Sequence, residues 1–183
     1  MDYTAFSHGQ LQSKLWLCDH LEPYIPHGSN IIILGSWYNL LGLLLLARNK
    51  DYNFVKGIDI DPNAISIANQ LCQGYMIQPD LKIYNEIADA NTYDYNGYQV
   101  FINCSIEHMN SDQWFNNIPN NFLVCLQSSN VNNNDPVWDI RNPTNNLEEF
   151  TKKYPLRHIL FRGVKTFNYD NLSYERYMLI GLK

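Results

Sequence analysis

The chain has 183 residues and a mass of 21.4 kDa, which is enough for one well-buried core and short for two. Apolar residues make up 45% of it and charged residues 17%, and this composition excludes a disordered chain. The net charge is −5, from 13 basic and 18 acidic residues, which argues against a large nucleic-acid footprint because such binding relies on Lys and Arg.

The first third of the chain alternates predicted helices and strands. Leucines at helical spacing predict a helix over residues 9–21, which Pro23 ends. Ile31–Leu34 is a short apolar run, typical of a strand that is buried on both faces. Leu40–Arg48 is apolar almost all round, which predicts a helix packed against a sheet, and Phe54–Ile60 reads as the second strand.

The middle of the chain continues this alternation. Asp61 and Pro62 predict a helix start, with Asp as the N-cap and Pro at the first helical position, and helical spacing continues to Cys72. Three strands are predicted at Leu81–Ile87, Tyr98–Asn103 and Asn121–Gln127, with a short helix from Ser111 and Asp112 through Trp114 and Phe115.

The last third is predicted to contain a loop, a helix and a hairpin. Ser128–Asn146 is rich in Asn, Asp and Pro and reads as a loop, followed by a helix over Leu147–Tyr154. His158–Phe167 and Tyr174–Leu182 are strand-like runs separated by a short polar gap, so they are expected to pair antiparallel. Alternating strands and helices predict an α/β fold: a Rossmann-like, doubly wound, mostly parallel seven-stranded sheet with a C-terminal antiparallel hairpin and helices on both faces. We expect one domain over 1–183, in which 1–29 is an N-terminal helical cap and 30–183 the core.

The four cysteines predict neither a disulfide framework nor a metal site. Cys18, Cys72, Cys104 and Cys125 show no CxxC pair and no Cys/His metal spacing, so we expect reduced thiols and no metal. The first residues lack the basic start and apolar core of a secretory signal. Leu40–Ala47 is the longest apolar stretch and is too short to span a bilayer. These features predict a cytoplasmic protein with no membrane partner.

Two strand ends carry the strongest ligand signal. The first strand stops at Gly35, where the backbone can turn sharply, and the second stops at the acid Asp59. In an open parallel sheet the carboxyl ends of such strands lie side by side, and ligands bind in the crevice outside them. This arrangement predicts a site for a nucleoside-type cofactor. A dinucleotide is disfavoured because GxGxxG is absent.

The segment Gly57-Ile-Asp-Ile-Asp-Pro-Asn-Ala resembles the class I S-adenosylmethionine-dependent methyltransferases. The resemblance covers roughly 31–183 and is clearest from Val55 to Met109. It implies that Asp59 binds the ribose hydroxyls of S-adenosyl-L-methionine, with Ile60 beside it. A carboxylate suits that role because it accepts two hydrogen bonds from neighbouring hydroxyls. Asp61 is predicted to cap the helix, and the alternative is that both acids are turn and cap residues.

Two later segments extend the resemblance. Asp89, next to Ala90, matches the family's acid after the third strand, which accepts from the adenine amino group; an ordinary turn Asp is the alternative. Asn103-Cys104-Ser105 is similar to the fourth-strand segment that lines the methionine end of the cofactor. Glu107 and His108 follow it, where they could order the loop, or His108 could act as a base. A structural histidine is the competing interpretation.

The glycine loop departs from the family pattern. An acid is usual two residues before Gly35 and further glycines two and four residues after it, whereas this chain has Ile33, Trp37 and Asn39. Gly35 remains, and Asn39 tolerates a left-handed backbone, so a tight turn is still possible at this point. Gly35, Ser36 and Trp37 are therefore still predicted to bind the cofactor. Trp37 and Tyr38 either stack on a ligand or fill space above the sheet.

These features predict a methyltransferase that acts on an O or N atom of a small molecule. The acceptor wall is expected from the N-terminal helix, the loop after Asn103 and the Asn-rich stretch, with candidate contacts at Gln12, Ser13, Lys14, Trp138, Asp139 and Arg141. One alternative is a catalytically degenerate binding or interaction protein, because loop glycines are missing. The other is an RNA-directed methyltransferase, suggested by Lys14 and the basic residues between 152 and 165. Asn103 is not followed by Pro-Pro-aromatic, which tells against amino-methylating DNA enzymes.

Overall fold

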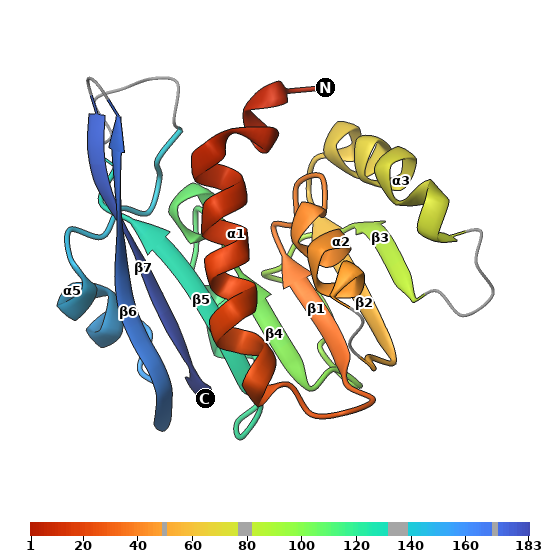
Figure 1. The fold of residues 1–183 in the computed structure, drawn as a ribbon. Helices are drawn as coiled ribbons and strands as arrows, with labels where there is room; N and C mark the ends of the chain where they lie inside the picture. Colours follow the sequence, from red (N-terminus) through yellow and green to blue (C-terminus); the bar gives the residue numbers. More distant parts are fainter. Residues whose placement is uncertain (49–50, 77–81, 132–138, 170–171) are drawn as a thin grey trace.

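The computed structural model describes residues 1–48, 51–76, 82–131, 139–169 and 172–183. In this part of the chain the strands form a seven-stranded sheet with the order β3-β2-β1-β4-β5-β7-β6 (Figure 1). The pairs from β3 through β5 are parallel, while β7 pairs antiparallel with both β5 and β6. The strands are β1 (Asn30–Leu34), β2 (Phe54–Asp59), β3 (Ile83–Ile87), β4 (Val100–Asn103), β5 (Leu123–Ser129), β6 (His158–Tyr169) and β7 (Leu172–Leu182).

Helices cover both faces of the sheet. On one face, α1 and α2 bury leucines against the odd-numbered isoleucines of β1, and α3 lies beside β2 and β3 (Figure 1). On the other face, aromatic residues of α4 and α5 pack against Ile32 and Leu34. The helices are α1 (His8–Leu21), α2 (Leu40–Ala47), α3 (Pro62–Met76), α4 (Gln113–Asn117) and α5 (Leu147–Lys153), with 3₁₀ turns η1 (Tyr3–Phe6), η2 (Glu22–Tyr24) and η3 (Ile106–His108). No helix in the described ranges is both long and apolar enough to cross a membrane.

The predicted fold class is confirmed, and the differences lie at element ends. β5 continues two residues into the predicted loop, because Ser128 and Ser129 still pair with β7. The hairpin strands extend further than predicted, to Tyr169 and from Leu172, while 170–171 lie outside the described residues, as does Leu81. The short turns η1 and η3 have no counterpart among the predicted elements.

The strand order reverses between β1 and β4. Strands β2 and β3 continue the sheet on one side of this point, and β5, β7 and β6 continue it on the other. A crevice outside the carboxyl ends of β1 and β4 is the expected ligand position in such a sheet. Figure 1 shows the N-terminal segment lying near this edge, above the arrowhead of β1. The fold therefore brings the predicted cofactor residues to one edge.

Candidate functional site

The turn after β1 has a glycine-type backbone although it contains one glycine. Gly35, Trp37 and Asn39 have φ values of 58°, 51° and 50°, all in the left-handed region. Non-glycine residues adopt this conformation uncommonly, and for a bulky side chain it is an outlier. Positions 37 and 39 are those at which the pattern of the similar family has glycines. The departure from the family pattern thus lies in residue type and not in the path of the backbone.

Hydrogen bonds to neighbouring strands impose this backbone path. The Ser36 N–H donates to the Ile58 carbonyl at 2.9 Å, and the Asn39 N–H donates to the Ser36 carbonyl at 2.8 Å. The Asn39 side chain is fully buried; its Oδ1 accepts from the Gly42 N–H at 3.2 Å, and its Nδ2 donates to Asn85 Oδ1 at 2.7 Å. Asn39 therefore caps α2 and joins the turn to β3.

Asp59, the last residue of β2, is hydrogen-bonded to this turn. Its Oδ2 accepts from the Trp37 N–H at 2.8 Å, and its Oδ1 accepts from the Asp61 N–H at 3.0 Å. Each carboxylate oxygen can accept a second hydrogen bond, so the side chain is fixed in place with capacity left for a ligand. The neighbouring Asp61 accepts from the Asn63 N–H at 2.8 Å, as expected of an N-cap.

Apolar side chains beside Asp59 face solvent. Ile60 is 70% exposed and Ile87 57% exposed, at the carboxyl ends of β2 and β3. Asp89 uses Oδ1 to accept from the backbone N–H of Asn91 at 2.8 Å and from its side-chain Nδ2 at 3.0 Å, so it organises the turn after β3. Ala90 is buried beneath that turn. An exposed apolar surface beside two carboxylates fits a nucleoside, whose base is flat and whose sugar donates hydrogen bonds.

Trp37 and Tyr38 stack on each other with ring centroids 4.8 Å apart. Tyr38 is buried, its hydroxyl accepts from the Asp2 N–H at 2.8 Å, and it packs with Ala5 and Ala64. Of the two roles considered for this pair, Tyr38 fills space and anchors η1. Trp37 stays partly exposed at the edge of the same cluster.

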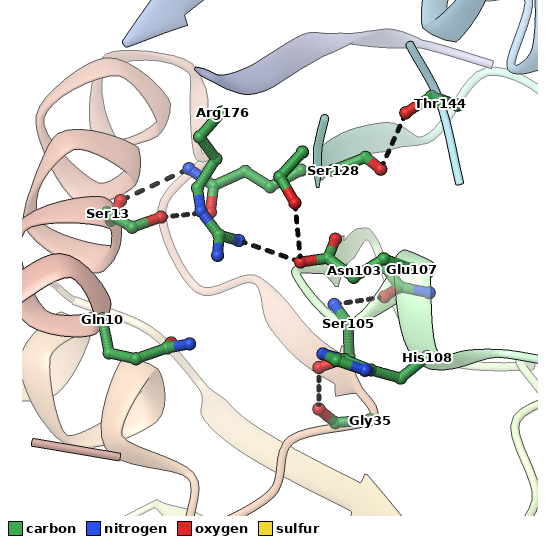
Figure 2. Close-up of polar contacts among 12 residues, drawn as sticks. Gln10, Ser13, Gly35, Asn103, Ser105, Glu107, His108, Ser128, Thr144 and Arg176 are labelled. Carbon is green, nitrogen blue, oxygen red and sulfur yellow. Dashed lines mark hydrogen bonds and ion pairs between the residues drawn. The ribbon is translucent and has the colours of Figure 1, made fainter. Parts of the chain in front are cut away.

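The end of β4 packs directly onto the Gly35 turn. Ser105 Oγ donates to the Gly35 carbonyl at 2.7 Å, and a Cβ at position 35 would lie 2.9 Å from Ser105 Cβ and 3.1 Å from Met109 Cε (Figure 2). Asn103 is fully buried and accepts from the Ser105 N–H at 3.0 Å. Burial raises the pKa of the Cys104 thiol to about 11, so Cys104 is protonated at neutral pH.

Glu107 and His108 are adjacent in η3 but point in different directions. Glu107 is 3% exposed; its Oε1 lies 3.5 Å from Arg176 Nη1 and 3.4 Å from Ser129 Oγ, which donates to it. His108 is exposed, and its Nδ1 lies 3.1 Å from the Asp139 carbonyl oxygen. Figure 2 shows the His108 ring beside Ser105. Only Glu107 therefore belongs to the interior.

The predicted acceptor-wall residues separate into two groups. From α1, Ser13 Oγ donates to Gln127 Oε1 of β5 at 3.0 Å, so Ser13 faces the sheet, whereas Lys14 Nζ donates to Gln10 Oε1 one turn earlier on the same helix at 2.7 Å. The third α1 candidate, Gln12, makes a backbone contact, with its carbonyl 3.5 Å from Lys165 Nζ. Arg141 and Asp139 form an exposed ion pair at 2.8 Å, and Trp138 lies outside the described residues.

Sequence reasoning missed Arg176, which is 5% exposed in β7. The sequence does offer a signal, because Arg176 directly precedes the apolar run Tyr177–Ile180, which the structure buries. A charge beside such a run predicts a buried partner, but it does not identify which one.

Gly57 is required by the close approach of the turn. A Cβ there would lie 2.6 Å from Asn39 Nδ2 and 2.7 Å from Ser36 Oγ, both buried. We expect Gly57→Ala to lower the free energy of unfolding by about 1–3 kcal/mol in urea denaturation, because it overpacks this contact. Gly74→Ala in α3 is the matched control: a Cβ there meets nothing within 4 Å, and a gain of about 0.5–1 kcal/mol is expected. Equal effects at both positions would contradict the packing explanation.

Other features of the described residues do not compete with this site. No group of three or more His, Cys, Asp or Glu side chains there could hold a metal ion. A shallow hollow is lined by residues of β2 and β3 and by Tyr98 ahead of β4, namely Phe54, Lys56, Tyr84, Asn85, Glu86 and Tyr98.

Comparisons with known proteins bear on the fold alone. No protein-family model and no curated protein sequence matches the chain. The structure is similar to that of the N-methyltransferase NodS from Bradyrhizobium japonicum WM9, with a TM-score of 0.69, 12% identity and full coverage of both chains. It is also similar to coclaurine N-methyltransferase bound to N-methylheliamine and SAH, with a TM-score of 0.70, 11% identity and coverage of 94% of this chain and 72% of that one. The [4+2]-cyclase SpnF matches with a TM-score of 0.63 and 13% identity, over 84% of this chain and 58% of that one.

The strand order has a switch point between β1 and β4, and in α/β proteins of this class ligands bind in a crevice outside the strand ends at such a point. Within that class, the chain has the fold of the class I S-adenosylmethionine-dependent methyltransferases. A cyclase is among its structural neighbours, so the reaction must be inferred from the site and not from the fold.

Proposed function

We propose that this protein is an S-adenosylmethionine-dependent methyltransferase that acts on an O or N atom of a small molecule. The observation that carries the proposal is the Asp59 carboxylate, held by the N–H groups of Trp37 and Asp61 at the switch point of the sheet. It keeps acceptor capacity for two neighbouring hydroxyls, the pattern that a ribose presents.

The chain's own residues divide the work of binding. In this proposal Asp59 accepts from the ribose hydroxyls, Ile60 and Ile87 offer the apolar surface for the base, and Asp89 accepts from the amino group of the base. When bound, S-adenosylmethionine supplies a sulfonium methyl group. The protein positions the acceptor and excludes water, a role that we assign to α1 and the Asn103–His108 segment.

A second candidate function is cofactor binding or interaction without catalysis. The observation in its favour is the close packing around Gly35, where Ser105 and Met109 occupy the position that a side chain would take. This packing leaves little room beside Gly35, where the methionine end of a cofactor would have to pass. A protein of this kind would bind the nucleoside part of the cofactor and leave its methyl group untransferred.

Thermal unfolding with S-adenosylhomocysteine tests the binding step. Ligand at about 100 times its Kd adds roughly 2.7 kcal/mol to the folded state. For a chain of this size the melting temperature should rise by about 5–10 °C. NAD at the same concentration is the control and should give no shift. Absence of a shift at millimolar S-adenosylhomocysteine, or an equal shift with NAD, would contradict the proposal, while binding without label transfer from methyl-labelled cofactor would favour the second candidate.

A further inference from the structure

Three charged side chains and two neutral polar ones gather between α1, the ends of β4 and β5, and strand β7. We call this group the inner charged cluster, and its members are Lys14, Cys104, Glu107, Ser129 and Arg176. Figure 2 shows the Arg176 guanidinium pointing toward Glu107, with α1 beside it and the Gln10 side chain below it in this view. The binding of a nucleoside at Asp59 makes no use of these residues.

The cluster carries one positive charge in excess. Arg176 and Glu107 form an ion pair and cancel each other. Within the described residues, Lys14 has no carboxylate at ion-pair distance, and its ammonium donates to the neutral Gln10 amide. An ammonium has three N–H donors, so the contact with Gln10 leaves two for other partners. Removing such a charge from water is costly unless an anion accompanies it.

Two enclosed atoms in the ion pair also lack partners. Glu107 Oε2 and Arg176 Nε are both buried with no hydrogen bond. Most buried polar atoms have a partner, so these two atoms have capacity for a further one, which water or a ligand can supply. An additional molecule in the cluster could supply hydrogen-bond partners both to the Glu107–Arg176 ion pair and to the Lys14 ammonium.

The pKa of Lys14 points the same way. It is lowered to about 8, chiefly by burial and further by the charge of Arg176, while Cys104 and Glu107 raise it. The attraction of Glu107 is therefore too weak to cancel the lowering of the Lys14 pKa by burial and by Arg176. An anion placed between Lys14 and Arg176 would lower the energy of both cations.

We propose that Lys14 and Arg176 recognise a carboxylate on the methyl acceptor, so that the acceptor is a small monocarboxylic acid. This inference rests on the proposed function, since it names the acceptor class for the same crevice. A monoanion is favoured over a phosphate dianion because it neutralises the single excess charge. A planar carboxylate also matches the donors of a guanidinium.

The test uses benzoate and benzamide as probes that differ in charge but hardly in shape. Each is titrated calorimetrically into the full chain, with and without saturating S-adenosylhomocysteine. We expect benzoate to bind at least ten times more tightly than benzamide. Lys14→Met should remove this preference and Lys14→Arg should retain it. Lys152→Met, at a lysine with a 75% exposed side chain, is the control and should leave it unchanged.

Two further measurements make the result independent of one variant. Benzoate affinity should fall as pH rises through about 8 in the wild type, because Lys14 loses its proton there, and it should stay constant in Lys14→Arg. The double variant Glu107→Gln/Arg176→Gln removes both charges of the ion pair, so neither is left buried without its partner. It should also bind benzoate at least ten times more weakly.

The outcomes separate the two proposals. Binding of S-adenosylhomocysteine without a preference for benzoate overturns the carboxylate assignment and leaves the proposed function standing. A benzoate preference without S-adenosylhomocysteine binding overturns the proposed function and leaves an anion site. Tighter binding of inorganic phosphate than of benzoate overturns the choice of a monoanion. An unchanged preference in Lys14→Met overturns the role of Lys14.

Discussion

We expect Arg176→Met to lower the free energy of unfolding by about 3–5 kcal/mol, because it leaves the buried Glu107 carboxylate without a cation at ion-pair distance. Glu107 is 3% exposed, its Oε2 already lacks a partner, and Ser129 would be its remaining side-chain donor. Urea denaturation at pH 7 measures the loss. Few single substitutions cost as much in a domain of ordinary stability.

The double variant Glu107→Gln/Arg176→Met is the matched comparison. A neutral amide costs far less to bury than an unpaired carboxylate, so most of the lost stability should return. Arg157→Met removes an exposed arginine that donates to Asn121 and should change stability by less than about 0.5 kcal/mol. If Arg176→Met were as mild as Arg157→Met, or if the double variant were no better than the single one, the ion pair would not have the role assigned to it.

The fold could be predicted because its signals are local. The run Ile31–Leu34 is apolar at every position, and in the structure its side chains enter the cores on both faces of the sheet. Asp61 and Pro62 mark the start of α3, and Asn146 caps α5 by accepting from the Glu149 N–H at 2.8 Å. Each of these features depends on residues within a few positions of one another, which sequence patterns report directly.

The direction of Glu107 could not be predicted in this way. Its partner Arg176 lies in the last strand and reaches it because β7 inserts between β5 and β6. In η3 a shift of one residue decides whether a side chain faces the interior or solvent, so Glu107 turns inward and His108 outward. The Glu-His pair, read as one unit in the sequence, is two residues with separate surroundings.

The turn after β1 shows a different limit of sequence reasoning. Asn39 tolerates a left-handed backbone, whereas Trp37 is a poor candidate for it on propensity, yet the structure places both there. The Trp37 N–H reaches Asp59, and the Asn39 side chain reaches Gly42 and Asn85, so long-range hydrogen bonds override local preference. A tight turn at this point depends on its neighbours more than on glycine.

We expect Asp59→Ala to abolish the rise in melting temperature that S-adenosylhomocysteine gives the wild type. Hydrogen bonds to a charged group contribute about 1.5–3 kcal/mol each, so losing two should weaken binding at least about 100-fold. The variant will also melt lower, because the N–H groups of Trp37 and Asp61 lose their acceptor. The decisive quantity is therefore the difference between melting temperatures with and without ligand, measured for each protein separately.

Asp61→Ala separates a ligand role from a structural one at the neighbouring acid. Asp61 accepts from the Asn63 N–H as a helix cap, so its loss should cost about 1 kcal/mol of stability and leave the ligand-induced shift intact. Asp59 ends β2, Asp61 follows it, and both accept from backbone N–H groups, yet Asp59 alone is held by two segments, through the N–H groups of Trp37 and Asp61. A shift that survives in Asp59→Ala but disappears in Asp61→Ala would move the ribose contact to Asp61. A shift that survives in both would mean that the left-handed turn and its carboxylate serve the fold and not a cofactor.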